Sequence, residues 1–229
     1  ILAKDASAQV NAEALRSTLR ENPRFLWLQS ALNGNAGNTS TITYSGAAFG
    51  GLTALPHLAF ARAAADFGAA KGETNIAKWM VHARYNYDVT ETIALEALAQ
   101  VQRDRFRRLS LRDVYGAGVR FALLESKNNE VFCGTTYLLE HEVIGDVPGS
   151  PGTNNLWHRS SDYFGVNLNV SPIVTASSVI YAQPRWDRPL DFRILSDTVV
   201  AFTITKLLSA GVSGTIWYDN RPPAGVHTY

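Results

Sequence analysis

The sequence contains a single cysteine, Cys133, a single methionine, and no run of 18 apolar residues. One cysteine excludes an intrachain disulfide framework and a zinc site built from several thiolates. The absence of a long apolar run excludes a membrane-spanning helix. Charged residues make up only 18% of the chain and the formal net charge is +1, so no basic field favours nucleic acid. These observations do not exclude a membrane β-barrel, because the alternating residues of its strands average to an ordinary hydropathy.

One segment near the N-terminus has helical periodicity. Ala8, Ala12, Leu15 and Leu19 recur at helical spacing between polar residues, and Asn22-Pro23 ends the pattern. We therefore expect a short helical segment within the first 22 residues.

From Phe25 onward, apolar and polar residues alternate with a period of two. Within residues 74–88, for example, Trp79 lies on one face of an extended chain and Lys78 and Arg84 lie on the other. Such runs exceed the roughly 5–6 residues of a typical soluble strand. They match the roughly 9–11 residues that a tilted strand needs to cross a bilayer. The predicted strands are Phe25–Asn33, Ser40–Phe49, His57–Phe67, Thr74–Asp88, Thr92–Asp104, Ser110–Leu123, Val131–Val143, His158–Val170, Val174–Gln183, Asp191–Thr205 and Val212–Asp219.

The connections between these segments are of two kinds. Residues 89–91, 171–173 and 206–211 are short, whereas residues 144–157 and 184–190 are longer or richer in Gly, Pro and Asn. Short periplasmic turns and longer external loops are typical of outer-membrane barrels.

The pattern therefore predicts an all-β fold, an antiparallel transmembrane β-barrel of about twelve strands over residues 23–229. A periplasmic helical segment, residues 1–22, precedes it. The alternative is a soluble sandwich or lipocalin-like barrel, which would carry charges on its exposed face and large aliphatic residues inside. Here the polar face mixes charges with many small residues, which suits a crowded lumen, so we favour the membrane barrel.

The predicted twelfth strand is incomplete, because only Val226–Tyr229 belongs to it. We expect the natural chain to continue for about 9–11 residues, enough for one membrane crossing. That strand would pair with Phe25–Asn33 and close the ring.

Short motifs in a fixed order resemble those of a known family. They are Trp27, Gly37-Asn38-Thr39, Tyr85-Asn86-Tyr87, Thr90-Glu91, Arg103-Asp104-Arg105-Phe106, Gly116-Ala117-Gly118-Val119-Arg120 and Tyr218-Asp219-Asn220-Arg221-Pro222-Pro223. In these motifs the chain resembles the salt-induced outer-membrane protein family of Gram-negative bacteria, a family of unknown function. The resemblance implies an outer-membrane barrel and assigns no catalytic residue, cofactor or ligand. The chain departs from the family pattern at its end, where family members complete a strand.

A set of charged residues falls on the polar parity of the predicted strands, so we expect these side chains to face the lumen. One interpretation is a selective pore lined by arginines against carboxylates. The other, which we favour, is a filled lumen in which paired charges hold the wall rigid, because the signs nearly balance and small barrels are filled by side chains. The set comprises Arg62, Asp66, Lys78, Arg84, Glu96, Arg112, Arg120, Glu140, Arg193 and Asp197.

A second candidate site is the pair His158 and Ser160, which share the outward face of one predicted strand. The spacing resembles the His-x-Ser arrangement of outer-membrane lipid hydrolases, in which the imidazole is the base for the serine hydroxyl. A polar strand end just above the bilayer accounts for the same residues. The Asn-Gly that follows the serine in the phospholipase version is missing. We therefore predict no catalytic residue and keep a lipid-modifying hydrolase as the alternative.

The remaining histidine, cysteine and arginine residues give no indication of a metal site, a cofactor site or catalysis. We predict no metal site and no cofactor, because the five histidines lie far apart without ligand spacing and no glycine-rich phosphate loop opens a helix. Cys133 shares parity with apolar neighbours and is expected to face lipid. Arg103, Arg105, Arg107 and Arg108 either contact anionic lipid head groups or belong to a solvated loop.

The sequence thus predicts a non-enzymatic protein of the bacterial outer membrane. Its expected role is envelope structure, membrane anchoring of a partner, or a narrow porin-like conduit with a largely filled lumen. The expected partners are outer-membrane lipids, lipopolysaccharide included, with another envelope protein as a further candidate and no nucleic acid.

Overall fold

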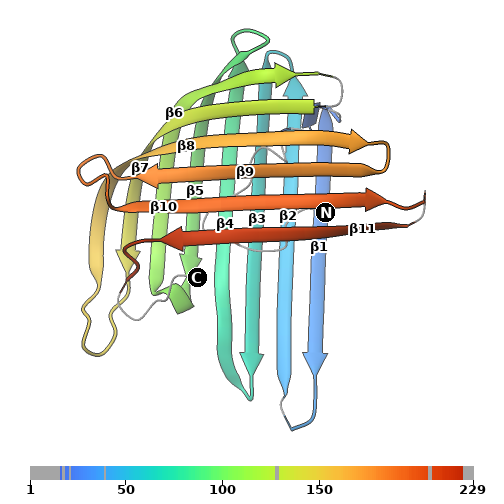
Figure 1. Ribbon diagram of the computed structural model, residues 1–229. Coiled ribbons are helices and arrows are strands. Elements are labelled where there is room, and N and C mark those ends of the chain that lie inside the picture. Colours follow the sequence, from blue (N-terminus) through green and yellow to red (C-terminus); the bar gives the residue numbers. More distant parts are fainter. Residues whose placement is uncertain are drawn as a thin grey trace.

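The computed structural model describes Arg16, Leu19, Arg20 and residues 22–38, 40–126, 129–205 and 208–223. These residues form one antiparallel sheet of eleven strands, arranged in sequence order (Figure 1). In the described part of the chain, one 3-10 turn, η1 (Arg105–Arg107), lies between the fifth and sixth strands. The strands are β1 (Arg24–Asn35), β2 (Thr41–Ala54), β3 (His57–Ala70), β4 (Glu73–Asp88), β5 (Ile93–Asp104), β6 (Leu109–Glu125), β7 (Asn129–Ile144), β8 (Thr153–Ser171), β9 (Val174–Pro184), β10 (Phe192–Thr203) and β11 (Ser209–Asp219).

The predicted all-β antiparallel fold is confirmed, and each of the eleven predicted segments overlaps one strand. The two largest boundary differences are equal. β8 begins at Thr153 and not at His158, because Thr153–Trp157 continues the ladder with β7, and β2 ends at Ala54 and not at Phe49, because residues 50–54 continue the ladder with β3. The predicted helical segment of residues 1–22 lies largely outside the described residues, and so does Val226–Tyr229.

The sheet curls until its C-terminal strands face its N-terminal strands. In Figure 1, β8–β11 cross in front of the strands of the N-terminal half. Two contacts join these parts: Tyr163 of β8 hydrogen-bonds Glu96 of β5 at 2.7 Å, and the Arg107 guanidinium of η1 lies 4.3 Å from the ring centroid of Trp217 in β11. The concave face of the sheet is therefore an interior. In the described part of the chain, β1 and β11 are the two edges of the sheet.

The connections gather at two opposite ends of the strands. We call the end at which β1 begins the short-turn end, and the other the loop end. Residues 55–56, 89–92, 126–128, 172–173 and 204–208 lie at the short-turn end. Residues 36–40, 71–72, 105–108, 145–152 and 185–191 lie at the loop end.

The loop end holds the two longest connections, residues 145–152 and 185–191, as predicted. It also holds a two-residue turn at Lys71-Gly72, where φ is 52° and 83°. Two successive positive φ values are typical of the type I′ turn that matches the twist of a hairpin. Loop length therefore varies along this end.

Side chains alternate between the interior and the exterior along each strand. In β4, Met80, His82 and Arg84 are buried, whereas Val81 and Tyr85 are exposed. Two apolar clusters lie in the interior. They are Leu19, Phe49, Leu58, Phe60 and Met80, and Phe132, Tyr163, Val179, Tyr181 and Leu195.

The described residues contain no helix that is long and apolar enough to cross a membrane.

Candidate functional site

The charged residues predicted to face the lumen lie in the interior of the curled sheet. Lys78 and Arg193 keep 25% and 11% of their side-chain surface exposed. The other eight are buried: Arg62, Asp66, Arg84, Glu96, Arg112, Arg120, Glu140 and Asp197.

Glu140 of β7 is the centre of the largest ion-pair cluster and is fully buried. Its Oε1 accepts a hydrogen bond from Nη1 of Arg193 at 2.6 Å, and its Oε2 accepts one from Nη2 of Arg112 at 2.9 Å. Nε of Arg159 lies 3.4 Å from the same Oε2. A buried carboxylate loses its hydration, which costs free energy. The three guanidiniums around Glu140 offset that desolvation cost with ion pairs and hydrogen bonds.

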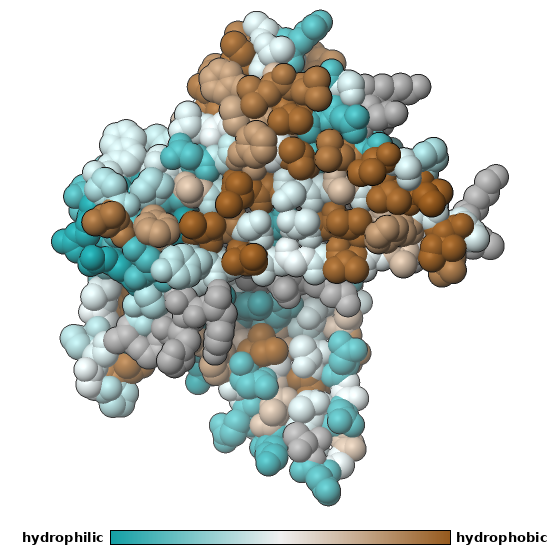
Figure 2. Space-filling model, viewed as in Figure 1, coloured by the Kyte–Doolittle hydropathy of each residue, from teal (hydrophilic) through white to brown (hydrophobic). Residues whose placement is uncertain are grey.

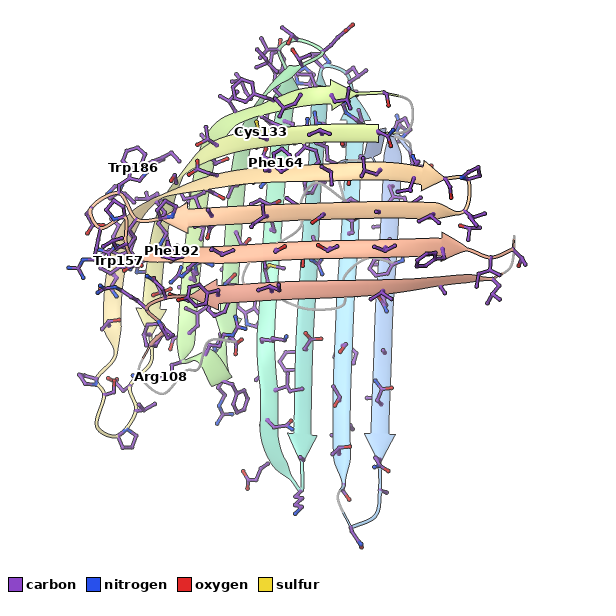
Figure 3. All side chains as sticks on the ribbon, in the orientation of Figure 1. Arg108, Cys133, Trp157, Phe164, Trp186 and Phe192 are labelled. Carbon is purple, nitrogen blue, oxygen red and sulfur yellow. The ribbon has the colours of Figure 1, made fainter. Side chains whose placement is uncertain are left out.

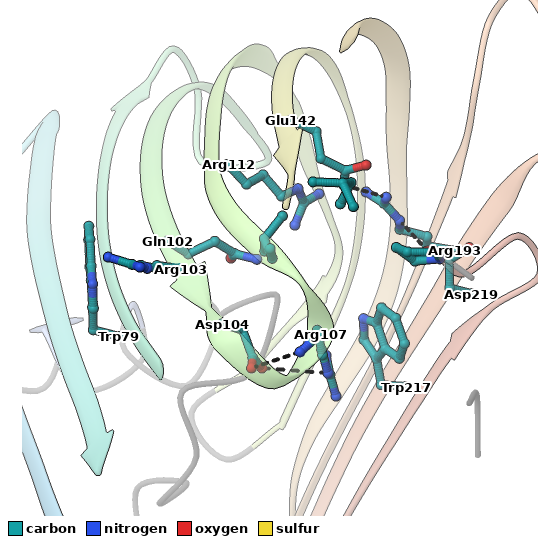
Figure 4. Close-up of a pocket in the computed structure, with 13 residues that line it drawn as sticks. Trp79, Gln102, Arg103, Asp104, Arg107, Arg112, Glu142, Arg193, Trp217 and Asp219 are labelled. Carbon is teal, nitrogen blue, oxygen red and sulfur yellow. Dashed lines mark hydrogen bonds and ion pairs between the residues drawn. The ribbon is translucent and has the colours of Figure 1, made fainter. Parts of the chain in front are cut away.

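Arg193 of β10 connects three strands (Figure 4). Besides Glu140, its guanidinium donates to Glu142 of β7 at 2.8 Å and to Asp219 of β11 at 2.8 Å. β7 and β10 are separated in the sheet by two strands. The planar fork of arginine therefore fixes the curvature of this part of the sheet.

The cluster continues into the loop end. Asp191 accepts hydrogen bonds from Arg159 at 3.1 Å and from Arg185 at 2.9 Å. The Arg185 guanidinium lies 3.4 Å from the ring centroid of Trp157, a cation–π contact, and also donates to Asp187. The hydrogen bond from Arg185 lowers the pKa of the exposed Asp187 carboxyl below its usual value. Ion pairs thus tie the loop 185–191 to β8.

A second cluster surrounds Glu96 of β5. One carboxylate oxygen accepts from Asn86 at 2.7 Å and lies 3.5 Å from the Arg84 guanidinium, and the other accepts from the Tyr163 hydroxyl at 2.7 Å. This cluster joins β4, β5 and β8, and its Tyr163 also belongs to the second apolar cluster.

A third cluster lies at the short-turn end. Nη2 of Arg120 donates to Glu130 at 2.6 Å, and Asn167 donates to the other oxygen of Glu130 at 2.9 Å. Arg16 donates to Asp88 at 2.9 Å. Sequence reasoning left Asp88 and Glu130 out of the candidate set, although their strand parity would have identified both. Nothing in the sequence pattern places Arg16 in the interior.

Two adjoining hollows open at the loop end, with volumes of about 50 and 200 Å³. Glu142, Ile144, Arg193 and Pro223 line both. Figure 4 shows the first, in which Trp79 and Trp217 lie on opposite sides of Arg103 and Arg107. Among the described residues, no group of three or more His, Cys, Asp or Glu side chains could hold a metal ion.

The structure does not bring His158 and Ser160 into a catalytic arrangement. Nδ1 of His158 is paired with the Tyr137 hydroxyl at 2.6 Å, and the Ser160 hydroxyl donates to Asp162 at 3.1 Å. Within the described part of the chain, no hydrogen bond joins His158 to Ser160. Both lie on the exterior, with His158 exposed and Ser160 half-buried.

The basic residues near η1 differ in their contacts. Arg108 donates to the carbonyl of Gly145 at 2.9 Å and to the carbonyl of Ser150 at 2.9 Å, so it holds the loop 145–152. Arg107 contacts Trp217 and forms an ion pair with Asp104. Both therefore have partners within the protein. Cys133, a free thiol, is half-buried.

One family model, described as "Protein of unknown function, DUF481", matches residues 29–228. The chain belongs to this family. The matched range includes nearly all of the sheet, the Glu140 and Glu96 clusters and both hollows. No curated protein and no solved structure matches the chain.

Proposed function

We propose that this member of the DUF481 family is a transmembrane β-barrel of the bacterial outer membrane, with a filled lumen and a non-enzymatic role in envelope structure or anchoring. The observation that carries the proposal is the reversed distribution of polarity. The described interior buries ionised side chains such as Glu140 and Arg120, while large apolar side chains such as Leu26 and Val212 are over 70% exposed. This arrangement is unfavourable for a protein surrounded by water. It is favourable for a barrel that has hydrocarbon on its outside and a polar lumen.

The exterior of β6 has the length that a bilayer requires. Between Asp113 and Glu125, its exposed large side chains are Tyr115, Phe121 and Leu123 together with the neighbouring Leu124. Twelve residue steps at about 3.3 Å, tilted by about 40°, span roughly 30 Å. Hydrocarbon cores are about 25–30 Å thick.

The exterior of β8–β11 carries a second apolar surface, visible as a band in Figure 2. Phe164, Ile180 and Ile216 lie on one cross-strand row of this face and are 46–63% exposed. In this row Ser196 of β10 stands between Ile180 and Ile216, so three of the four strands contribute a large apolar side chain. Exposed apolar patches of this kind favour contact with lipid over contact with solvent.

Two pairs of histidine and tyrosine lie on the exterior of the sheet, one on β3 and β4 and the other on β7 and β8. His57 hydrogen-bonds Tyr85 at 2.7 Å near the short-turn end, and His158 hydrogen-bonds Tyr137 at 2.6 Å near the loop end. Trp186, which belongs to the loop 185–191 (Figure 3), packs against Tyr137 with ring centroids 5.0 Å apart. Side chains with an apolar ring and a polar tip favour the lipid–water boundary.

Ring closure is part of the proposal. The described sheet has two edges, β1 and β11, and each unpaired backbone group in hydrocarbon costs several kcal/mol. A twelfth strand between these edges would close the barrel and keep both chain ends on one side of the membrane. The resemblance to the salt-induced outer-membrane protein family supports the same location.

Filled interiors favour a scaffold over an open pore. The Glu140 and Glu96 clusters pair charges of opposite sign across strands, and two apolar clusters occupy further parts of the interior. Lipids of the outer membrane, lipopolysaccharide among them, are the expected surroundings.

Membrane fractionation tests the proposal. Protein expressed with an export signal in a Gram-negative host should float with outer-membrane lipid in a sucrose gradient and resist extraction by 4 M urea. A folded protein recovered in the soluble periplasm would contradict it.

A further inference from the structure

The larger hollow at the loop end is lined mainly by arginines. Its volume is about 200 Å³, and a water molecule in the liquid takes about 30 Å³, so the hollow has room for a group of several heavy atoms. Its walls come from β7, β8 and β10 and from the loops 145–152 and 185–191. The charged side chains of the lining are five guanidiniums and two carboxylates: Arg108, Arg159, Arg185, Arg193 and Arg221, with Glu142 and Asp191.

The positive charges stay in excess when the neighbouring acids are counted. Glu140, Asp187 and Asp219 contact these arginines from outside the lining, and Arg112 shares Glu140. The whole set therefore carries six positive and five negative charges. The excess lies at Arg221, whose exposed guanidinium forms no ion pair with any described residue, while its backbone N–H is held by Asp219 at 2.9 Å.

Two arginines of the lining are fixed in place and still have N–H groups to donate. Arg193 donates three described hydrogen bonds, to Glu140, Glu142 and Asp219, out of the five N–H groups of a guanidinium. Arg185 also donates three, to Asp187 and Asp191, and stacks on Trp157. A guanidinium that is already held loses little side-chain entropy on binding a ligand, and its planar fork matches two oxygens of a phosphate.

We propose that this hollow binds a phosphate monoester group, with Arg185, Arg193 and Arg221 as its donors. Such a group carries a charge of about −1.5 to −2 at pH 7 and three acceptor oxygens, so it compensates the excess charge and accepts from several guanidiniums together. Its source is the head group of an outer-membrane lipid or a phosphate in solution. Only the lipid source rests on the proposed barrel, in which the longer loops are external.

Asn155 of β8 allows a charge to be placed in the hollow without removing an arginine. Its side chain is half-buried, lines the hollow and donates to the Thr153 hydroxyl at 2.9 Å. Asn154 is exposed and lies outside the lining. Asn155→Asp and Asn154→Asp therefore change the net charge and the side-chain size equally, and only the first puts a carboxylate against the bound phosphate.

Calorimetric titration of inorganic phosphate into the folded full chain in detergent micelles tests the site. The wild type should bind phosphate, and Asn155→Asp should weaken binding roughly tenfold or more, because like charges would then face each other. Arg221→Gln should also weaken it roughly tenfold, since one charged donor is lost. Asn154→Asp, and Arg188→Gln in the same loop region but outside the lining, should bind like the wild type. Circular dichroism checks that each variant is folded.

Mixed micelles distinguish the two sources. If a lipid head group is the ligand, lipopolysaccharide should compete with inorganic phosphate and its dephosphorylated form should not. If neither form competes, the ligand is phosphate in solution. A wild type that binds no phosphate, or equal affinities of the wild type, Asn155→Asp and Arg221→Gln, would overturn the site. Failure to float with membrane lipid would contradict the barrel alone, because the titration is made in micelles.

Discussion

The Tyr163 hydroxyl donates a 2.7 Å hydrogen bond to Glu96 across the interior of the sheet, although β8 and β5 are not neighbours in it. The Tyr163 ring has room because position 134 of the adjacent strand is glycine, where a Cβ would lie 2.3 Å from the ring. One glycine and one carboxylate thus set how far the sheet curls at this point.

Tyr163→Phe should lower the free energy of unfolding by about 1.5–3 kcal/mol, the usual worth of a hydrogen bond to a charged group. Urea unfolding followed by tryptophan fluorescence measures the change. Tyr115→Phe, on the exposed face of β6, is the control and should be nearly neutral. Equal effects of the two substitutions would show that the hydrogen bond from Tyr163 to Glu96 does not stabilise the folded protein.

Glu140→Gln should be more damaging, because Arg112, Arg159 and Arg193 would then crowd together without their shared carboxylate. Breaking a buried ion pair from one side costs about 3–5 kcal/mol. Glu73→Gln, at an exposed position of β4, is the matched control. A Glu140→Gln protein that unfolds at the wild-type urea concentration would show that the cluster is not structural.

Val200→Arg places a charge on the predicted lipid face of β10 and should cost roughly 2–4 kcal/mol in membranes. The same change at Val147, in the loop 145–152, should cost much less because that residue lies outside the strands. Folding equilibria in lipid vesicles, read from gel mobility without heating, give both values. Equal tolerance at the two positions argues against lipid contact at Val200.

The loop 185–191 should loosen in acid. Because Arg185 lowers the pKa of Asp187 in the folded protein, this contact stabilises the loop above the unfolded pKa of Asp, about 3.9, and is lost as pH falls through the folded value. The Arg185 Nε–H resonance, whose donor lies 3.0 Å from Asp187, should shift over that acid range in NMR spectra. In Asp187→Asn the shift should be absent at the same pH.

Local pattern predicted the strands because alternation is a property of each strand by itself. It missed the first residues of β8, since Thr-Asn-Asn-Leu-Trp at 153–157 does not alternate and is ordered by pairing with β7. Parity likewise placed Glu140 and Arg193 inside but could not give their partners, which come from strands far apart in sequence. The helical periodicity includes Leu19, but the side chains it packs against, Phe49 and Met80 among them, depend on tertiary structure and could not be predicted. The pattern of a single strand likewise cannot predict that His158 pairs with Tyr137, which lies on the neighbouring strand.

Spin-label accessibility along β6 tests the central claim most directly. Single cysteines at residues 114–122, in a Cys133→Ala background and in lipid vesicles, carry a nitroxide probed by lipid-soluble oxygen and by a water-soluble nickel chelate. The account predicts a period of two: residues 115, 117, 119 and 121 reached by oxygen and not by nickel, with the intervening positions reached poorly by oxygen. Nickel access to Val119 and Phe121 equal to that of a loop position such as Val147 would place this face in water and contradict the membrane barrel.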